Sequence, residues 1–597
     1  MTAANRFKSF IRKPHNVILV ALAISLSFLT LFPLLSLVRD TVIVHPSELM
    51  SIRGSKPGDL TIFHWRKVFF DGETSQNLFY KPFWNTINIS LGACLVSLVL
   101  GGGVAWLITR SDLRWKSFIS TAFIFPYIMP SWTLAMAWLN FFRNRLIGGA
   151  PGLFTALTGI ETPNWFAYGA FPIVIVLGLH YAPFAYILIG GILRNMDANL
   201  EEAAVILKAS RFKILRRITM PIVMPAILST FLLVFSSCMS AFAVPAFLGT
   251  PVRFQVLTTQ LFRTLNGLNP GYGYIMALVM IVLGTLILMI NQWFVGKRKS
   301  FTTVTGKSSN ISLVKLRSLR TPLSAGLVLF ILAVAVLPLV TFAIESFILA
   351  PGDYSFKNMT LQFWAGEGRV DIGGGEPGIL LNKYIYLGLW NSIRLSVVVA
   401  LVAGSVGVLA GYAIVRTRGT RLSGYVNNLA FFPYLMPSMA FGAIYLSMFA
   451  KPNLFIPSLY GSFALLVLVG AVKYLPFASR AGINAMLQLS GEIEEAGLIL
   501  GVPWWKRMTR IIFPIQKSSF LSGYLLPFIS CMRELALFVL LITPANRVLT
   551  TMLFQYNEKG WNQYANAINL MIVVIVLVFN TAINKITGAS IDKGIGG

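Results

Sequence analysis

The chain has 597 residues, of which 56% are hydrophobic and 12% charged, and its formal net charge is +28. A soluble domain carries about 25% charged residues, so this composition excludes an ordinary soluble protein. The basic residues fall in alternate short loops between apolar segments, as in the cytoplasmic loops of membrane proteins. We therefore expect a lipid bilayer, and no nucleic acid, as a partner.

About twelve apolar segments are long enough to cross a bilayer, which takes about 20 residues in a helix. Backbone groups in lipid must pair within their own segment, so we expect an all-α fold with a transmembrane helix at each segment. The segments are 17–38, 84–108, 118–142, 167–193, 219–247, 272–295, 322–344, 392–415, 425–449, 462–486, 518–542 and 563–584.

The first segment is longer than the core of a cleaved signal peptide, and no small-residue cleavage site follows it. We therefore expect it to be retained as a transmembrane helix. Basic residues precede it and follow every second segment, whereas the loops between carry few. This alternation predicts a multi-pass membrane protein with both termini in the cytoplasm.

Several motifs occur twice at nearly constant spacing, which indicates two repeats. Each half contains an even number of segments, so the repeats have the same orientation in the membrane. We divide the chain into a first unit (1–296), a basic cytoplasmic linker (297–321) and a second unit (322–597). The matched motifs are Trp84-Asn85 with Trp390-Asn391, Phe125–Ser131 with Phe432–Ser438, and Tyr181–Phe184 with Tyr474–Phe477.

The most informative repeated segment lies at 197–221 in the first unit and at 490–514 in the second. Each copy begins with acidic residues, ends with basic ones and stops at a proline that starts the next apolar segment. Acidic residues favour the start of a helix and basic residues its end. We expect two short helices with a turn, projecting into the cytoplasm. A loop lying on lipid headgroups is the alternative, and two matched copies make it less favoured.

These segments resemble the cytoplasmic loop of binding-protein-dependent ABC importer permeases. Glu202-Ala203-Ala204 and Glu495-Ala496-Gly497 match the start of that loop, and Gly501 matches its glycine. The resemblance covers nearly the whole chain and implies two fused units of the type I ABC importer permease fold. Lys208 stands where the family has glycine. If the position needs a left-handed turn, lysine costs roughly 1 kcal/mol, so we expect the first loop to bend differently.

The resemblance also implies the partners. The loops would dock on two copies of a cytoplasmic ABC ATPase, an extracytoplasmic binding protein would deliver the solute, and this chain would lie in a bacterial inner membrane. The chain itself would be no enzyme and would bind no cofactor or metal. The residues implied in coupling are Glu202, Ala203, Ala204, Lys208, Glu495, Ala496, Gly497 and Gly501.

The cargo is less clearly indicated. Ala243–Gly249 and Arg533-Glu534-Leu535-Ala536 look most like the ferric-iron permeases, while permeases for thiamine, polyamine, sulfate or aminophosphonate share the same plan. An ion-driven secondary transporter also has two six-span halves. Its typical Gly-x-x-x-Asp-Arg-x-Gly-Arg loop does not occur after the second span, which disfavours it.

Ionisable residues within apolar segments are functional candidates. His180 and Lys473 occupy equivalent positions 293 residues apart, and Arg394, Arg533 and Glu534 lie in other segments. We hypothesise that Glu534 meets Lys473 or Arg394 at a gate in the translocation pathway. A buried ion pair that only fixes helix packing is the alternative. Prolines in segments 118–142 and 425–449 predict bends, either beside the pathway or as packing kinks.

Overall fold

A computed structural model describes residues 13–52, 54–196, 199–296, 313–450, 452 and 457–587. Within these residues the regular structure is helical, with three isolated β-bridges and no named strand. Nine of the described helices are long and apolar enough to cross a membrane, or up to eleven if each of two bent pairs forms one span. The all-α polytopic fold is confirmed, whereas the count of twelve is not.

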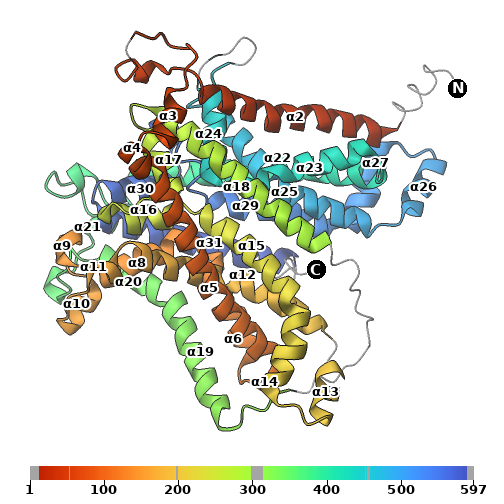
Figure 1. The fold of residues 1–597 in the computed structure, drawn as a ribbon, viewed down its shortest axis with the longest axis horizontal. Helices are drawn as coiled ribbons and strands as arrows, with labels where there is room; N and C mark the ends of the chain where they lie inside the picture. Colours follow the sequence, from red (N-terminus) through yellow and green to blue (C-terminus); the bar gives the residue numbers. More distant parts are fainter. Residues whose placement is uncertain are drawn as a thin grey trace.

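The principal helices of the first half can be followed in Figure 1 by their colours, from red at α2 to yellow-green at α18. They are α2 (Pro14–Asp40), α3 (Phe63–Phe69), α5 (Lys81–Arg110), α6 (Lys116–Ala122), α7 (Phe125–Ile128), α8 (Ser131–Phe142), α12 (Ala170–Asn195), α13 (Asn199–Ile206), α14 (Arg211–Ile214), α15 (Met220–Met239), α16 (Ala243–Gly249), α17 (Leu257–Leu265) and α18 (Pro270–Gly296).

The second half repeats this order after the linker, of which residues 297–312 lie outside the described residues. Its helices are α19 (Arg320–Ala335), α20 (Leu337–Ser346), α22 (Lys383–Arg416), α23 (Arg421–Leu435), α24 (Ser438–Phe449), α25 (Phe463–Leu487), α26 (Gly491–Ile499), α27 (Trp504–Arg507), α29 (Lys517–Met532), α30 (Leu549–Glu558) and α31 (Asn562–Thr587).

Two predicted spans are sharply bent, and two others are helical only in part. Segment 118–142 bends by 90° before α8, and segment 425–449 bends by 109° between α23 and α24. Segment 219–247 breaks after α15, and segment 518–542 is helical only as far as Met532. The bends follow Met129 and Met436, each of which precedes a proline, and a residue before proline is disfavoured in the helical region.

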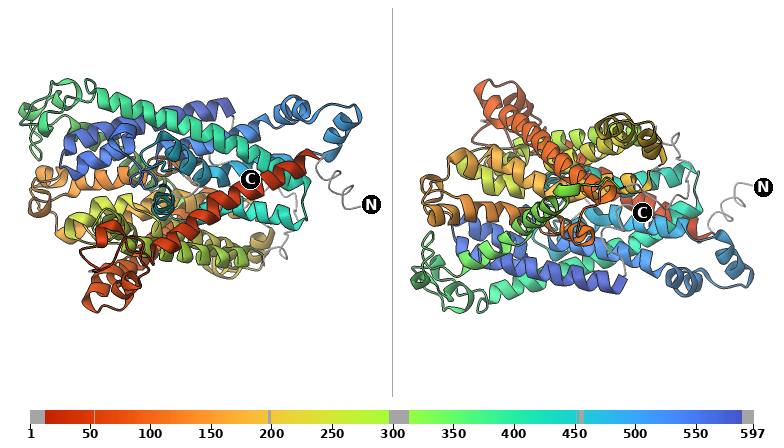
Figure 2. Two further views of the ribbon diagram at one scale, coloured as in Figure 1. Left: turned by 90° about the horizontal axis from the view of Figure 1, so that it is seen from above. Right: turned by 90° about the horizontal axis from the view of Figure 1, so that it is seen from below.

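The two halves exchange their first spans. α2 packs along α22, α23 and α24 of the second half, whereas α19 and α20 pack against α6 and α8 of the first. Figure 2 shows the red α2 crossing the green and blue-green helices of the second half. Neither half is therefore a separate bundle.

The apolar core is continuous between the halves at one end and divided at the other. Leu37, near the end of α2, belongs to a large cluster that includes residues of both halves. Leu19, near the start of α2, belongs to a smaller cluster with helices of the second half, and the matching part of the first half has its own cluster around Tyr186. The halves are thus joined at the end containing Leu37 and less closely packed at the opposite end.

The repeated Trp-Asn motif has the same role in both halves. The Asn85 side chain donates to the Gln255 carbonyl at 2.9 Å, and the Asn391 side chain donates to the Arg547 carbonyl at 3.0 Å. Each asparagine thus holds the segment before α17 or α30 against a long helix. These matched contacts explain why the motif occurs at equivalent positions.

Candidate coupling loops and translocation pathway

The first candidate coupling loop consists of α13 and α14, and residues 197–198 of the predicted segment lie outside the described residues. Between the helices, Lys208 has a φ of +57°. The Ala209 N–H donates to the Ala204 carbonyl at 3.0 Å. A left-handed residue with this hydrogen bond is a common way to end a helix.

The second candidate coupling loop has the same construction in α26 and α27. Gly501 has a φ of +68°, and the Val502 N–H donates to the Gly497 carbonyl at 2.9 Å. The Ser490 hydroxyl accepts a hydrogen bond from the Glu492 N–H at 3.3 Å, which caps the start of α26. Figure 1 shows α13 and α26 at the same end of the molecule, apart from each other.

The expectation that Lys208 makes the first loop bend differently is wrong. Lys208 and Gly501 adopt the same left-handed conformation, and the turn hydrogen bonds are equivalent. Lys208 is exposed, so its side chain extends into solvent without a clash. The remaining penalty is the backbone strain of a residue with a Cβ atom, roughly 1–2 kcal/mol.

Each loop is anchored to the second long helix of its own half by an ion pair. Arg110 at the end of α5 lies 3.6 Å from Glu201, and Arg416 at the end of α22 lies 2.7 Å from Glu494. Arg507 also lies 3.9 Å from Glu494. Our sequence reasoning missed these pairs, although two arginines at equivalent helix ends, facing two equivalent glutamates, were a usable signal.

The alternation of exposed and buried small residues fits helices with one free face. Ala203 and Ala496 are exposed, whereas Ala204 and Gly497 face the protein. A Cβ atom on Gly497 would lie 3.0 Å from the Arg507 side chain, so the glycine makes room for that anchor. Of the two motif glutamates, Glu495 is exposed and Glu202 is half-buried.

Apolar side chains lie exposed at the tips of both loops. Ile206 and Leu207 are 80% and 81% exposed, and the equivalent Ile499 and Leu500 are 85% and 80% exposed. Exposed apolar surface of this kind commonly marks an interaction site. The two loops therefore present equivalent exposed apolar surfaces.

His180 and Lys473 hold the two broken helices. Proline has no N–H, so the carbonyl four residues earlier loses its helical partner. His180 Nδ1 donates to the Pro126 carbonyl at 3.0 Å, and Lys473 Nζ donates to the Pro433 carbonyl at 3.1 Å. These carbonyls lie four residues before Pro130 and Pro437.

Arg533 joins the second half to the broken helix of the first. It donates to the Tyr127 carbonyl at 2.8 Å and to the Ile128 carbonyl at 3.2 Å, and its guanidinium lies 5.6 Å from the centre of the Tyr127 ring. A cation at the end of a helix is stabilised by exposed carbonyls. The equivalent of Arg533 in the first half is Ser240, so only one half makes this contact.

In the described part of the chain, the predicted contact between Glu534 and Lys473 or Arg394 is not a direct ion pair, and the role of Glu534 at a gate stays a prediction. Glu534 accepts hydrogen bonds from the Tyr474 hydroxyl at 2.7 Å and from the Leu537 N–H at 3.0 Å, and the described residues include no ion pair to it within 4 Å. Arg394 instead lies over the Phe463 ring at 4.0 Å. Glu534 follows the end of α29, where its carboxylate caps the backbone.

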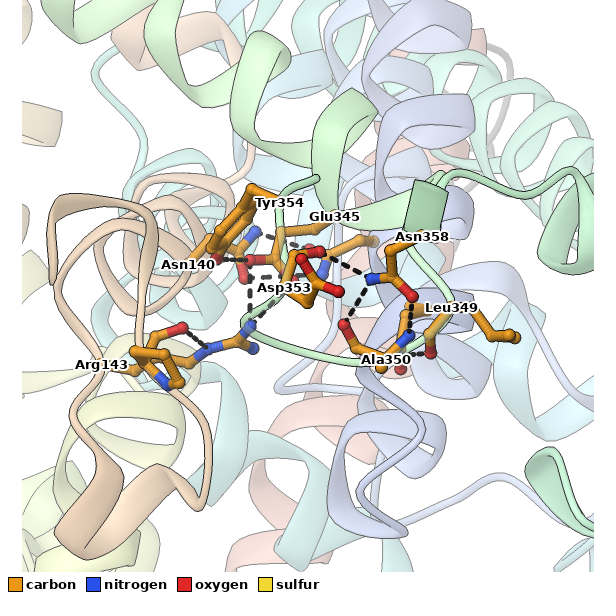
Figure 3. A network of polar contacts seen from close by, with 11 residues as sticks. Asn140, Arg143, Glu345, Leu349, Ala350, Asp353, Tyr354 and Asn358 are labelled. Carbon is orange, nitrogen blue, oxygen red and sulfur yellow. Dashed lines mark hydrogen bonds and ion pairs between the residues drawn. The ribbon is translucent and has the colours of Figure 1, made fainter. Parts of the chain in front are cut away.

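A buried ion pair connects the halves at the joined end. Arg143, which follows α8, donates to both carboxylate oxygens of Glu345 in α20 at 3.0 Å. The Tyr354 hydroxyl donates to the same carboxylate at 2.6 Å (Figure 3). Nearby, the Asn140 side chain donates to Asn566 of α31 at 2.8 Å. Our sequence reasoning did not single out these residues.

This fold and these loops define an integral-membrane transport permease built from two repeats. The chain belongs to the family of binding-protein-dependent transport system inner membrane components, whose sequence model matches residues 97–300 and 403–590. It is therefore a permease subunit of an ABC importer, in a family that works with ATPase and binding-protein components.

The names of similar proteins mention different solutes. The ferric transport system permease protein FbpB of Actinobacillus pleuropneumoniae is 26% identical over 555 residues, covering 88% of this chain and 76% of that protein. The putative ferric transport system permease protein FbpB 1 of Haemophilus influenzae is 26% identical, covering 81% and 75%. The probable sulfate transport system permease protein cysT of Prototheca wickerhamii is 26% identical, covering 36% and 83%.

Proposed function

We propose that this permease carries ferric iron across the inner membrane, and that two copies of a cytoplasmic ATPase drive it through α13 and α26. The matched exposed apolar residues at the loop tips carry the ATPase assignment, because two equivalent surfaces suit two identical subunits. Two relatives that align with most of the chain are named as ferric transport permeases, which supports ferric iron as the solute. A sulfate, polyamine, thiamine or aminophosphonate permease is the second candidate, since a sulfate permease also matches part of the chain.

We assign the end containing α13 and α26 to the cytoplasm, together with both termini. Arg110 and Arg416 lie at this end, as do the basic residues of α14 and α27. Ile18, near the start of α2, packs in the same cluster as Trp504 of α27, so α2 begins at this end too. The positive-inside rule then gives the orientation.

From this orientation we infer an inward-facing state. The shared core and the Arg143–Glu345 pair close the extracytoplasmic side. Towards the cytoplasm the core is divided into separate apolar clusters, each of which includes residues of an exchanged first span. ATP binding would bring the ATPase subunits, and with them α13 and α26, closer together.

We propose that the bends in the middle of the bundle border the translocation pathway. Lys473, His180 and Arg533 hold the carbonyls that the bends expose. Glu534 caps the chain after α29, and Arg394 rests on an aromatic ring. These five residues would shape the pathway by fixing the position of the backbone or of an aromatic ring beside it. The proposal includes no catalytic group and no cofactor of this chain's own.

The test is co-purification of this chain with a co-expressed ABC ATPase subunit, followed by uptake in vesicles. Glu495→Arg and Leu500→Glu should each abolish ATPase retention, because both side chains are exposed on α26. Phe356→Glu, an equally exposed substitution in the outer loop, should leave retention unchanged. Retention by the Glu495 and Leu500 variants would contradict the docking assignment.

The same vesicles test the cargo. Uptake of radioactive ferric iron should require both ATP and the binding protein, and excess sulfate or spermidine should not compete. Iron-independent uptake of one of those solutes would replace the iron assignment while leaving the coupling assignment intact. Uptake without any ATPase would instead support an ion-driven transporter.

A further inference from the structure

The described end of the linker is bound to the loop between α5 and α6. Val314 forms an isolated parallel bridge with Ser111. Its N–H donates to the Arg110 carbonyl at 2.8 Å, and its carbonyl accepts from the Asp112 N–H at 3.1 Å. The linker therefore pairs with this loop through a single parallel β-bridge.

Asp112 extends the attachment to the first span of the second half. Its carboxylate accepts from the Leu316 N–H at 2.8 Å and lies 3.8 Å from Arg320, the first residue of α19. Arg320 also donates to the Asp112 carbonyl at 2.6 Å. One turn further, the Ser324 hydroxyl accepts from the Arg114 N–H at 3.0 Å. The α5–α6 loop and the start of α19 thus form one hydrogen-bonded unit.

The side chain of Arg110 connects this unit to the first coupling loop. Arg110 is 2% exposed. It donates to the carbonyls of Leu193 at 3.0 Å and Met196 at 3.3 Å, and it lies 3.6 Å from Glu201 of α13. The Arg110 carbonyl therefore accepts a hydrogen bond from the linker. Its guanidinium forms hydrogen bonds to the end of α12 and an ion pair with α13.

The second half has no equivalent bridge to a linker among its described residues. The loop after Arg416 is closed by its own bonds: the Thr420 N–H donates to the Thr417 carbonyl at 3.2 Å, and the Thr420 hydroxyl accepts from the Ser423 N–H at 3.2 Å. The extra anchor occurs only beside the loop that carries Lys208 in a left-handed turn. An added anchor can offset the strain at that position.

We propose that linker residues 313–320 are a positioning element for the first coupling helix and tie its movement to α19, the first span of the second half. The proposal rests on the proposed role of α13 as an ATPase-docking helix. Force applied to α13 passes through Glu201 and Arg110 to the α5–α6 loop, and from there through Asp112 and Arg320 to α19.

Two neighbouring substitutions test whether linker residues 313–320, here called the tether, restrain the first coupling helix in the full-length protein. Val314→Pro removes the N–H that bonds to Arg110. Lys315→Pro is the matched control, because the Lys315 N–H makes no hydrogen bond among the described residues. A nitroxide on Leu207→Cys reports on the first loop and one on Leu500→Cys on the second, since both positions are exposed and all three native cysteines are buried.

Val314→Pro should shorten the rotational correlation time of the label at 207 several-fold and leave the label at 500 unchanged. Lys315→Pro should change neither. Asp112→Ala, which leaves every backbone donor in place, should also free the label at 207. An unchanged label at 207 in both the Val314 and Asp112 variants would overturn the tether, as would equal loosening at 500. These spectra need no ATPase, so a failure of ATPase retention would overturn the proposed function separately.

Discussion

His180 and Lys473 bind equivalent carbonyl oxygens, those of Pro126 and Pro433, at 3.0 and 3.1 Å. An imidazole in one half and an ammonium in the other therefore satisfy the same backbone group. The shared requirement arises from a proline four residues later, which cannot supply the helical N–H. These two intramembrane residues thus have a structural task that their different charges do not reveal.

Lys473→Met should destabilise the protein by about 1–3 kcal/mol, because it removes the donor to the carbonyls of Pro433 and Met436. The measurement is the thermal unfolding midpoint of the purified protein in detergent. Pro437→Ala supplies a new N–H for the same carbonyl, so Lys473→Met should cost less in that background. An equal loss in both backgrounds would show that Lys473 acts mainly through its second contact, the Met436 carbonyl, and not through Pro433.

Lys208→Gly should stabilise the first coupling loop by roughly 1 kcal/mol, because glycine adopts the left-handed turn without strain. Gly501→Ala should destabilise the second loop by a similar amount, since the space around Gly501 is open and only the backbone conformation opposes the methyl group. Hydrogen exchange at the amides of residues 203–209 and 496–502 measures both effects. Faster exchange in Lys208→Gly would contradict this account.

Arg143→Ala should destabilise the protein by about 3–5 kcal/mol, because it leaves the Glu345 carboxylate buried without its partner. Replacing both residues by Met and Leu should restore most of the loss. Arg369→Ala is the control. It breaks an exposed pair with Asp371, which is expected to change stability by at most about 1 kcal/mol. Thermal unfolding that ranks Arg369→Ala with Arg143→Ala would contradict the prediction.

The outer loop contains a carboxylate with a depressed pKa. Burial raises the pKa of Glu48, but hydrogen bonds from the His64 ring, the His45 N–H and the Gly271 N–H outweigh this and lower it below 4.5. Because the folded pKa is the lower one, the stabilisation is present above 4.5 and disappears as the pH falls through the folded value.

Glu48→Gln should remove this dependence. The stability advantage of the wild type over the variant should be constant at neutral pH and shrink in acid. Unfolding midpoints of both proteins, compared from about pH 7 to about pH 3, measure it. A difference that grows as the pH falls would contradict the sign.

Sequence patterns predicted the features set by local chemistry and repetition. Apolar length identified most spans, and the acidic and basic ends of 490–514 predicted α26 and α27. Long-range contacts were not predictable in this way. Nothing local to Glu534 shows that it accepts a hydrogen bond from Tyr474, or that Arg533 reaches Tyr127 in the other half.

The breaks after Met239 and Met532 were missed for a related reason. The residues on either side are apolar enough for a continuous span, and hydropathy cannot distinguish a helix from an irregular segment buried in protein. The structure supplies the missing partners. The Ala241 carbonyl accepts from the Thr258 hydroxyl and the Glu534 carbonyl from the Thr550 hydroxyl, both at 2.8 Å.

The distance between nitroxides at Arg216→Cys and Thr509→Cys, in the assembled transporter, tests most directly whether the two coupling loops are moved by ATP. Both sites are exposed at equivalent positions beyond the loop tips, so the labels leave Leu207 and Leu500 free to contact the ATPase. We expect the distance to shorten when ATP is bound and to return to its initial value after hydrolysis. A distance that stays constant while ATP is bound and solute is taken up would contradict the proposed coupling.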